Sequence, residues 1–265
     1  MKNHVRNVIQ KEKAELTTKP GISCVERSSM WRRSGQVSIT LFAVLVLFLN
    51  ASALAPVKTT TVPLDSFKDM QPRNVKTELV NYKGRKALRV TDMAPANAPD
   101  GIQLVILSKT EFQDGIIEIE LAGEPGAAAG QGARGFVGVA FHVNLDPSTD
   151  AARYECFYLR PTNGRADDQV RRNHSTQYIS YPDFPWQRLR KEFPEKYESY
   201  VDLVPGEWTK VKIEVRGGEA RLYVHDTPQP VLVINDLKQG RGQGRIALWV
   251  GAGTVGHFSN LRVSK

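Results

Sequence analysis

The chain has 265 residues, a formal net charge of +8 and two cysteines. The first 55 residues carry eight Lys and Arg against three Asp and Glu, so most of the positive excess lies there and the remainder is close to balanced. We therefore expect no nucleic-acid ligand. Because Cys156 is the only cysteine after residue 55, an intramolecular disulfide in that part of the chain is excluded.

Residues 30–55 have the three parts of a secretory signal peptide. Two arginines follow the methionine, an apolar segment covers residues 37–49, and small-residue cleavage sites precede Pro56. The longest unbroken apolar run is too short to span a hydrocarbon core about 30 Å thick. We expect cleavage after Ala53, export to the periplasm or the exterior, and no stable membrane insertion afterwards; a single anchor helix is the alternative.

Residues 1–29 precede this signal peptide and show no apolar periodicity. We interpret them as the product of a start codon assigned too early, with an extended n-region as the alternative. The domain organisation is then this leader, a signal peptide at 30–55 and one domain at 56–265.

The domain is predicted to be all-β, because short runs of alternating apolar and polar residues recur with turn signals between them. Residues 57–85 are expected to give a first strand and a loop. The clearest hairpin covers 208–225, where Gly217 and Gly218 supply the turn. A short turn near 187–193 is the only helical structure expected. The other expected strands are residues 87–90, 101–108, 115–121, 136–144, 153–160, 231–234, 244–250 and 257–263.

This pattern favours a two-sheet antiparallel β-sandwich of jelly-roll type. A β-propeller is excluded by the absence of blade repeats. Cys156 lies in a strand pattern, where it is predicted to be a small core residue rather than a nucleophile.

Four segments carry a resemblance to a known family: "FQDGIIEIELAG", "GFVGVAFHV", "GEWTKVKIEVRGGEARLYVHDTPQPVLVIND" and "GRIALWVGAGTVGHFSNLRV". Over roughly residues 64–263, the chain resembles concanavalin A-like (laminin G-like) jelly-roll domains. It is most similar there to bacterial 3-keto-disaccharide hydrolase-like domains. The resemblance implies the sandwich fold and an activity on carbohydrates.

Residues 154–200 contain ten of the nineteen aromatic residues that follow the signal peptide. They interrupt the strand pattern with prolines and arginines, as a long functional loop does. One interpretation is a platform on which sugar rings stack, with arginines to bind hydroxyl, carboxylate or sulfate groups. The other is a structural cluster that attaches the loop to the sandwich. The candidate substrate-binding residues are Arg160, Asn163, Arg165, Tyr178, Tyr181, Trp186 and Arg188.

The candidate catalytic residues are His142, Glu155 and His174, which could supply acid–base chemistry of hydrolase or lyase type. If the loop folds over the sheet, Tyr178, Trp186, Arg160 and His174 should converge on one pocket.

A second acidic set and a possible ion site complete the candidates. Glu118, Glu120 and Glu124 are an alternative catalytic set, because alternate strand residues share a face. No zinc spacing, phosphate loop or nucleophile elbow is present in the sequence. No cofactor is expected, except that Asp146 and Asp150 could hold Ca²⁺.

The sequence thus leaves two main functions open. The first is an exported carbohydrate-processing domain, glycoside hydrolase-like, that acts on oligosaccharides or modified glycosides. The second is a non-catalytic, lectin-like glycan-binding module. Both have a carbohydrate ligand as the partner. A structural or adhesive surface protein is a third, less supported function.

Overall fold

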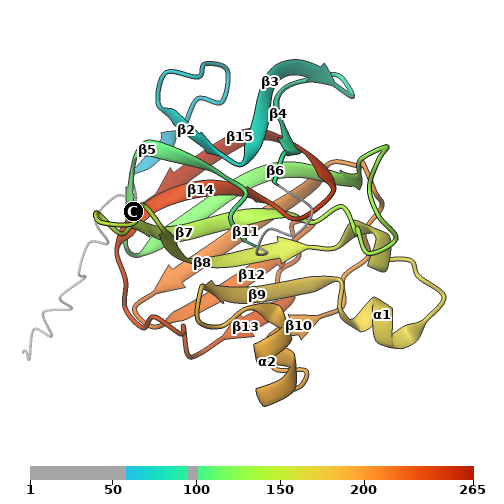
Figure 1. Ribbon diagram of the computed structural model, residues 1–265. Coiled ribbons are helices and arrows are strands. Elements are labelled where there is room, and N and C mark those ends of the chain that lie inside the picture. The colour runs from blue at the N-terminus through green and yellow to red at the C-terminus, as the bar shows by residue number, and fades with distance from the viewer. Residues whose placement is uncertain (1–57, 95–100) are drawn as a thin grey trace, which may run out of the picture. The chain divides into compact units, whose positions relative to one another are not determined.

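The computed structural model describes residues 58–94 and 101–265. The predicted leader and signal peptide lie outside the described residues. The described part contains two antiparallel sheets that pack face to face (Figure 1). The prediction of an all-β sandwich of jelly-roll type is confirmed.

Sheet A has eight strands in the order β13-β12-β11-β6-β15-β4-β3, with β1 paired beside β15. Its strands are β1 (Thr59–Thr61), β3 (Val75–Tyr82), β4 (Arg85–Asp92), β6 (Gly115–Pro125), β11 (Thr209–Arg216), β12 (Glu219–Val224), β13 (Leu232–Ile234) and β15 (Thr254–Ser264).

Sheet B has seven strands in the order β10-β9-β8-β7-β14-β5-β2. Its strands are β2 (Met70–Arg73), β5 (Leu104–Phe112), β7 (Val137–Leu145), β8 (Ala152–Leu159), β9 (Thr176–Tyr181), β10 (Glu198–Ser199) and β14 (Gly244–Val250).

The core lies between the sheets and is built from apolar residues that alternate along the strands. On β6 and β11, Ile117, Ile119 and Ile213 are at most 1% exposed, while the residues between them face solvent. Cys156 is fully buried and has a free thiol, as predicted. The hairpin of β11 and β12 turns at Gly217, whose φ of +59° suits glycine.

The structure corrects the sequence prediction in three segments. The segment 57–85, described from residue 58, contains the three strands β1, β2 and β3 rather than one strand and a loop. Residues 176–181, assigned to the irregular stretch, form β9 inside sheet B. On β7, the pairing with β8 shifts between Phe141 and Asn144, so the alternation expected over 136–144 breaks at His142.

Helical structure is confined to short segments beside sheet B. The helix α2 (Trp186–Glu192) confirms the turn expected near 187–193, whereas the 3₁₀ turn η1 (Pro161–Asn163) and the helix α1 (Gln169–Asn173) were not expected. Asp168 starts α1 by accepting a hydrogen bond from the backbone N–H of Arg171. Within the described residues, no helix is long and apolar enough to cross a membrane.

Candidate functional site

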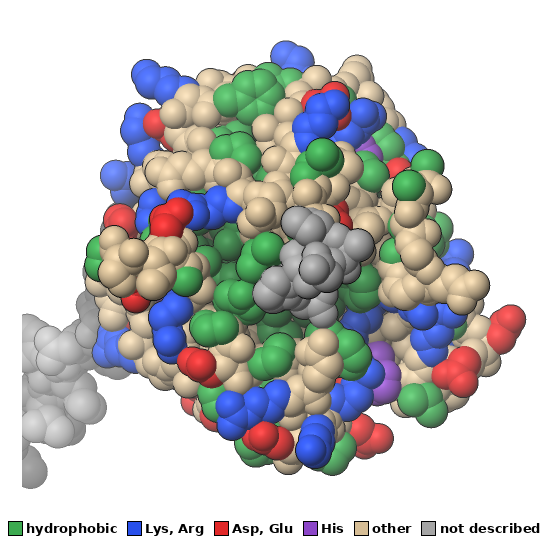
Figure 2. Space-filling view, in the orientation of Figure 1, with side chains coloured by type: hydrophobic (Ala, Val, Ile, Leu, Met, Phe, Trp, Pro, Cys, Tyr) green, Lys and Arg blue, Asp and Glu red, His purple; other side chains and the backbone are tan. Residues whose placement is uncertain are grey.

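The main pocket of the described residues lies at one end of sheet B and has a volume of about 880 Å³. Because the sheet is antiparallel, the start of β7, the end of β8 and the end of β14 meet at this end. Figure 2 shows this face of the molecule hollowed, with hydrophobic side chains inside and Lys and Arg side chains around the hollow. Loop residues 128–134, η1, α1 and the start of α2 complete the walls.

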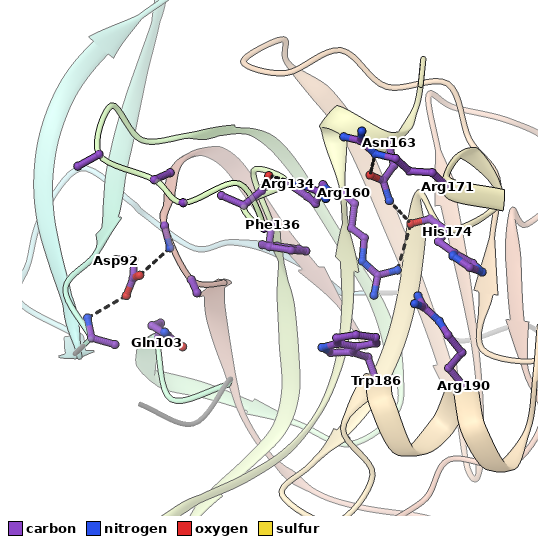
Figure 3. A pocket seen from close by; sticks show the side chains of 18 of the residues that line it. Asp92, Gln103, Arg134, Phe136, Arg160, Asn163, Arg171, His174, Trp186 and Arg190 are labelled. Atoms are coloured by element: carbon purple, nitrogen blue, oxygen red, sulfur yellow. Dashed lines mark hydrogen bonds between the residues drawn. The ribbon is translucent and has the colours of Figure 1, made fainter. Parts of the chain in front are cut away.

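Aromatic side chains form one part of the wall. Phe136 and the half-buried Trp186 lie on either side of the pocket in Figure 3. Phe136 packs edge to face on Tyr158 at 6.1 Å between ring centroids, and Tyr158 stacks on Trp249 at 4.6 Å. A small cavity of about 40 Å³ adjoins this cluster and is also lined by Tyr181. The pocket therefore has an apolar surface that is continuous with the outer face of sheet B.

Arg160 is buried beneath this surface, and both of its Nη groups are engaged. Its Nη1 donates to Glu198 at 2.8 Å and to the carbonyl of His174 at 3.0 Å. Its Nη2 donates to the Tyr158 hydroxyl and to Gln177, both at 2.9 Å. Arg160 thus fixes the strands and loops that carry the pocket, and its guanidinium stacks 5.8 Å from the centroid of Trp186.

Glu198 joins three basic side chains at the base of the pocket. It accepts hydrogen bonds from Arg160 and Arg190, and its Oε2 lies 3.6 Å from His174 Nε2. Burial would raise the pKa of Glu198, but the hydrogen bonds from Arg190 and Arg160 and their charges outweigh it and lower that pKa. Burial lowers the pKa of His174; the charge of Glu198 opposes this effect, but the charges of Arg190 and Arg160 add to it, and the pKa remains lowered. His174 is therefore neutral at neutral pH and can accept a proton.

Two further arginines, Arg134 and Arg171, line the pocket, and Asn163 connects Arg171 to the backbone of His174. Burial lowers the pKa of Arg134, and the nearby charges of Arg171 and Arg160 lower it further. The carboxylates of the pocket wall are engaged with backbone: Asp92 accepts from the N–H groups of Ala94 and Gly253. Asp168 caps α1. The charged groups of the pocket wall that have no ion-pair partner among the described residues, Arg134 and Arg171, are therefore positive.

Several of the residues singled out from the sequence meet in this pocket. Arg160, Asn163, Trp186 and His174 line it. Three of the four residues expected to converge therefore do so. Asn163 is 4% exposed and connects His174 to Arg171, because it donates to the carbonyl of His174 and accepts from Arg171 (Figure 3).

Other candidates lie elsewhere. Tyr178 is fully buried, because the alternation along β9 points it to the core side of sheet B, where its hydroxyl donates to Glu155 at 2.6 Å. His142 is buried too and bonds the carbonyl of Gln113, so neither His142 nor Glu155 lines the pocket with His174. Arg165 pairs with Asp202 and Arg188 with Glu192, both exposed.

The acidic residues considered from the sequence have protein partners. Glu118, Glu120 and Glu124 lie on sheet A and contact Arg262, Arg85 and Tyr82, respectively. Asp146 accepts three hydrogen bonds from Ser148 and Thr149, which lower its pKa to about 2, and Asp150 binds Arg73. Among the described residues, no three His, Cys, Asp or Glu side chains form a group that could hold a metal ion.

Sequence reasoning missed Arg134, Phe136, Gln103 and Arg190, all of which line the pocket. The first three come from segments outside residues 154–200, and the antiparallel pairing brings them to the same end of sheet B. The signal that could have found Arg134 and Phe136 is their place at the start of the strand predicted at 136–144: Arg134 lies just before it, and Phe136 is its first residue.

Comparisons with known proteins identify the fold. No family model matches the chain, and no curated protein matches it. Among solved structures, a Bacillus subtilis protein of unknown function with a galectin-like fold is similar with a TM-score of 0.52 and 12% identity, covering 78% of this chain and 97% of that one. The carbohydrate-binding module CBM66 of Bacillus subtilis gives a TM-score of 0.45 at 14% identity, covering 73% of this chain and 97% of the module.

A β-glucanase of Bacillus licheniformis gives 0.41 at 14% identity, with 78% and 92% covered. At 12% identity, the likeness to the protein with a galectin-like fold shows the fold alone: the described residues form a galectin-like jelly-roll sandwich.

Proposed function

We propose that the protein is exported and binds a carbohydrate in the pocket at the end of sheet B. The observation that carries this proposal is the combination of Trp186 and Phe136 with oriented polar side chains around one cavity of about 880 Å³. That volume is within the range of pockets that enclose small ligands. Sugar rings present apolar C–H faces that stack on aromatic rings, while their hydroxyl groups need donors and acceptors at the edges.

The way in which the pocket is built supports binding in a fixed orientation. Arg160 and Asn163 are each 4% exposed and are held by several hydrogen bonds, so the groups above them do not need to be ordered by the ligand. A preorganised site loses less entropy on binding than a mobile one. Arg190 stacks on Trp186 at 4.7 Å from the ring centroid, which fixes the plane of the proposed platform.

Carbohydrate processing is the second candidate, and His174 is the observation that favours it. A neutral imidazole at the wall of the pocket, 3.6 Å from Glu198, can accept a proton from a bound sugar. The three residues first considered for catalysis are not assembled, so this candidate depends on His174 and not on His142 or Glu155.

The test is a glycan array probed with the full chain, followed by product detection by mass spectrometry on the same oligosaccharides, including oxidised and uronic sugars. Binding without turnover selects the binding module. Turnover that His174→Gln abolishes, with affinity retained, selects processing. Failure to bind any glycan contradicts both. N-terminal sequencing of secreted protein tests export, and an intact residue 1 in the cytoplasm would contradict it.

A further inference from the structure

Two arginines of the pocket differ from most other arginines of the described residues because no carboxylate neutralises them. Arg160 and Arg190 share Glu198, and arginines on the rest of the surface, such as Arg165 and Arg188, have acidic partners. The guanidinium groups of Arg134 and Arg171 form no ion pair with a described carboxylate. Their hydrogen bonds go to carbonyl, amide and hydroxyl oxygens.

These two guanidinium groups are held in place and still have donors to spare. Arg171 Nε donates to Asn163 at 2.9 Å, its Nη2 donates to Thr162, and Nη1 has no partner among the described residues. Arg134 Nη1 donates to the carbonyls of Gln131 and Ala133, which leaves Nε and Nη2. The backbone N–H of Thr162 donates to the carbonyl of Arg134, which connects the two segments.

The electrostatics of this corner favour an anion. Arg134 and Arg171 are close enough for each charge to disfavour the other, and Arg160 adds a third charge. An anionic group between them would remove this repulsion and accept the unused donors, which is how guanidinium groups bind carboxylate and sulfate. The nearest acid of the pocket, Asp168, is engaged with the backbone of α1.

A second observation, at the opposite side of the pocket, points to a ligand that also carries a hydroxyl group. Gln103 is 2% exposed, lines the pocket, and its Oε1 has no hydrogen-bond partner among the residues that the structure describes. A buried acceptor without a donor is costly, typically about 1–3 kcal/mol. Figure 3 shows Gln103 across the pocket from Arg171, with Phe136 between them. A bound sugar hydroxyl that donates to Gln103 would satisfy this acceptor.

We infer that the ligand is an acidic glycan whose carboxylate or sulfate group is bound by Arg134 and Arg171 while one of its hydroxyl groups donates to Gln103. This inference rests on the proposed carbohydrate function and adds the chemical class of the sugar. The ring of Phe136 lies between the two polar ends (Figure 3), and Trp186 lines the same pocket beside Arg190; both rings would contact the faces of the sugar.

The test uses the full chain on an array of matched oligosaccharide sets. Each set contains a uronate oligosaccharide, the same backbone with its carboxylates reduced to hydroxymethyl groups, and the same backbone with sulfate esters. The variants are Arg134→Gln and Arg171→Gln. The matched control is Arg172→Gln, because Arg172 is the next residue, forms no ion pair within 4 Å with a described carboxylate, contacts Tyr200 and does not line the pocket.

We expect the anionic form of one set to bind at least about tenfold more tightly than its neutral form. Arg134→Gln and Arg171→Gln should each remove this preference and leave the affinity for the neutral form unchanged, whereas Arg172→Gln should keep the preference. Whether the uronate or the sulfated form is preferred identifies the acid. Melting temperatures show whether each variant folds; Arg134 contacts only carbonyls of its own loop, so its variant should fold even if that of Arg171 does not.

Two outcomes overturn the inference in distinguishable ways. Equal affinity for the neutral and anionic forms, unchanged in Arg134→Gln, overturns the acidic class and leaves the proposed carbohydrate function standing. Absence of binding to every set overturns both. A preference that Arg172→Gln removes as effectively as Arg134→Gln would show a diffuse charge effect and would also contradict the assigned pair.

Discussion

The outer faces of the two sheets differ in how deeply their residues are buried and in whether their charged side chains are paired. On sheet A, β11 and β12 alternate between core and solvent, and the solvent-facing charges pair with neighbours, as in Lys210–Asp226 and Lys212–Glu214. On sheet B, nearly every residue of β8, β9 and β14 is buried, because aromatic residues, α2 and loops cover the outer face. The charges there are few, mostly buried, and only partly neutralised.

The difference teaches where function is to be expected in a sandwich with two similar layers. Sheet A satisfies its charges within the protein and gains little from a ligand. Sheet B combines an aromatic surface with cations that have no acidic partner among the described residues, and with Gln103 Oε1, an acceptor that has no donor there. A charged or polar group that lacks a partner in a rigid surrounding lowers the stability of the protein. A ligand that supplies the missing partner removes this cost, which contributes to its affinity.

The largest difference between the faces should appear when one acid is neutralised on each. Glu198 and Arg160 have side chains only 3% and 5% exposed, so Glu198→Gln leaves a buried cation and should cost about 3–5 kcal/mol of unfolding free energy. Asp226 and Lys210 are 68% and 58% exposed, so Asp226→Asn should cost less than about 1 kcal/mol. Urea unfolding of both variants measures this. Similar losses would show that the comparison of the faces is wrong.

The second prediction concerns His257, a buried exception on sheet A. Its ring stacks on Tyr82 at 3.6 Å between centroids, and burial, followed by the charges of Arg89 and Lys83, lowers its pKa from 6.5 to about 4. Between these values the unfolded chain binds more protons than the folded protein, so stability is lost as the pH falls from 6.5 to 4. We expect about 2–3 kcal/mol from this residue.

The measurement is the unfolding free energy of the wild type and of His257→Gln across this pH range. Because His142 and His174 also have lowered pKa values, the difference between the two proteins is the relevant quantity. The control is His225→Gln, at an exposed histidine, in which stability should depend on pH as it does in the wild type. If the stability of His257→Gln depends on pH as that of the wild type does, the loss of stability is not due to His257.

The third prediction compares two half-buried tryptophans, one beside each sheet. Trp186 lines the pocket beneath Arg190, and Trp208 packs beneath Arg85 next to sheet A. Trp186→Ala should reduce glycan affinity by about 1–3 kcal/mol, by analogy with the stacking of bases on aromatic rings. Trp208→Ala should leave affinity unchanged. Calorimetric titration together with melting temperatures decides this, and a lower melting temperature with unchanged affinity in Trp186→Ala would make Trp186 a structural clamp.

The smallest effect is expected at Gln103. Gln103→Met removes an acceptor without a partner, so stability should stay the same or rise by about 1 kcal/mol, while glycan affinity falls. The control is Thr110, a buried residue whose hydroxyl donates to Leu107 at 2.7 Å and accepts from Ile246 at 2.9 Å. Thr110→Val should lose about 1–2 kcal/mol of stability. A destabilised Gln103→Met would mean that Gln103 supports the fold instead of the ligand.

The two sheets also differ in how well the sequence predicts them. The alternation in β6, β11 and β12 predicts sheet A directly, since one face is core and the other is solvent. In β8 and β9 both faces are buried, so apolar and polar residues do not alternate there. The sequence therefore predicts an irregular loop in place of β9. If residues 176–181 are taken as a loop, the rule that neighbouring strand residues point to opposite faces is not applied to them. That rule directs Tyr178 to the core and its neighbour Gln177 to the other face, where it accepts a hydrogen bond from Arg160.

The candidate site was predictable where its residues are close in sequence. Arg160, Asn163, His174 and Trp186 belong to one aromatic and basic stretch, and composition alone indicated them. Gln103, Arg134 and Phe136 come from two distant segments, and only the pairing of β5, β7 and β14 brings them to the same end of the sheet. Whether an arginine has an acidic partner likewise depends on these long-range pairings, so the unneutralised pair could not be recognised beforehand.

The strand β1 pairs with the last residues of β15, so that Thr59 lies opposite Ser264. The backbone of Lys265 also donates to the carbonyl of Lys58. A short linker could therefore join these two positions, and new termini could be opened at the turn of Gly217 and Gly218, where no neighbouring atom lies within 4 Å of an added Cβ. Such a circular permutant would keep every neighbour in both sheets. It would present its ends beside β11 and β12, which makes that turn, rather than the loops around the pocket, the place at which to fuse a reporter or attach the protein to a surface.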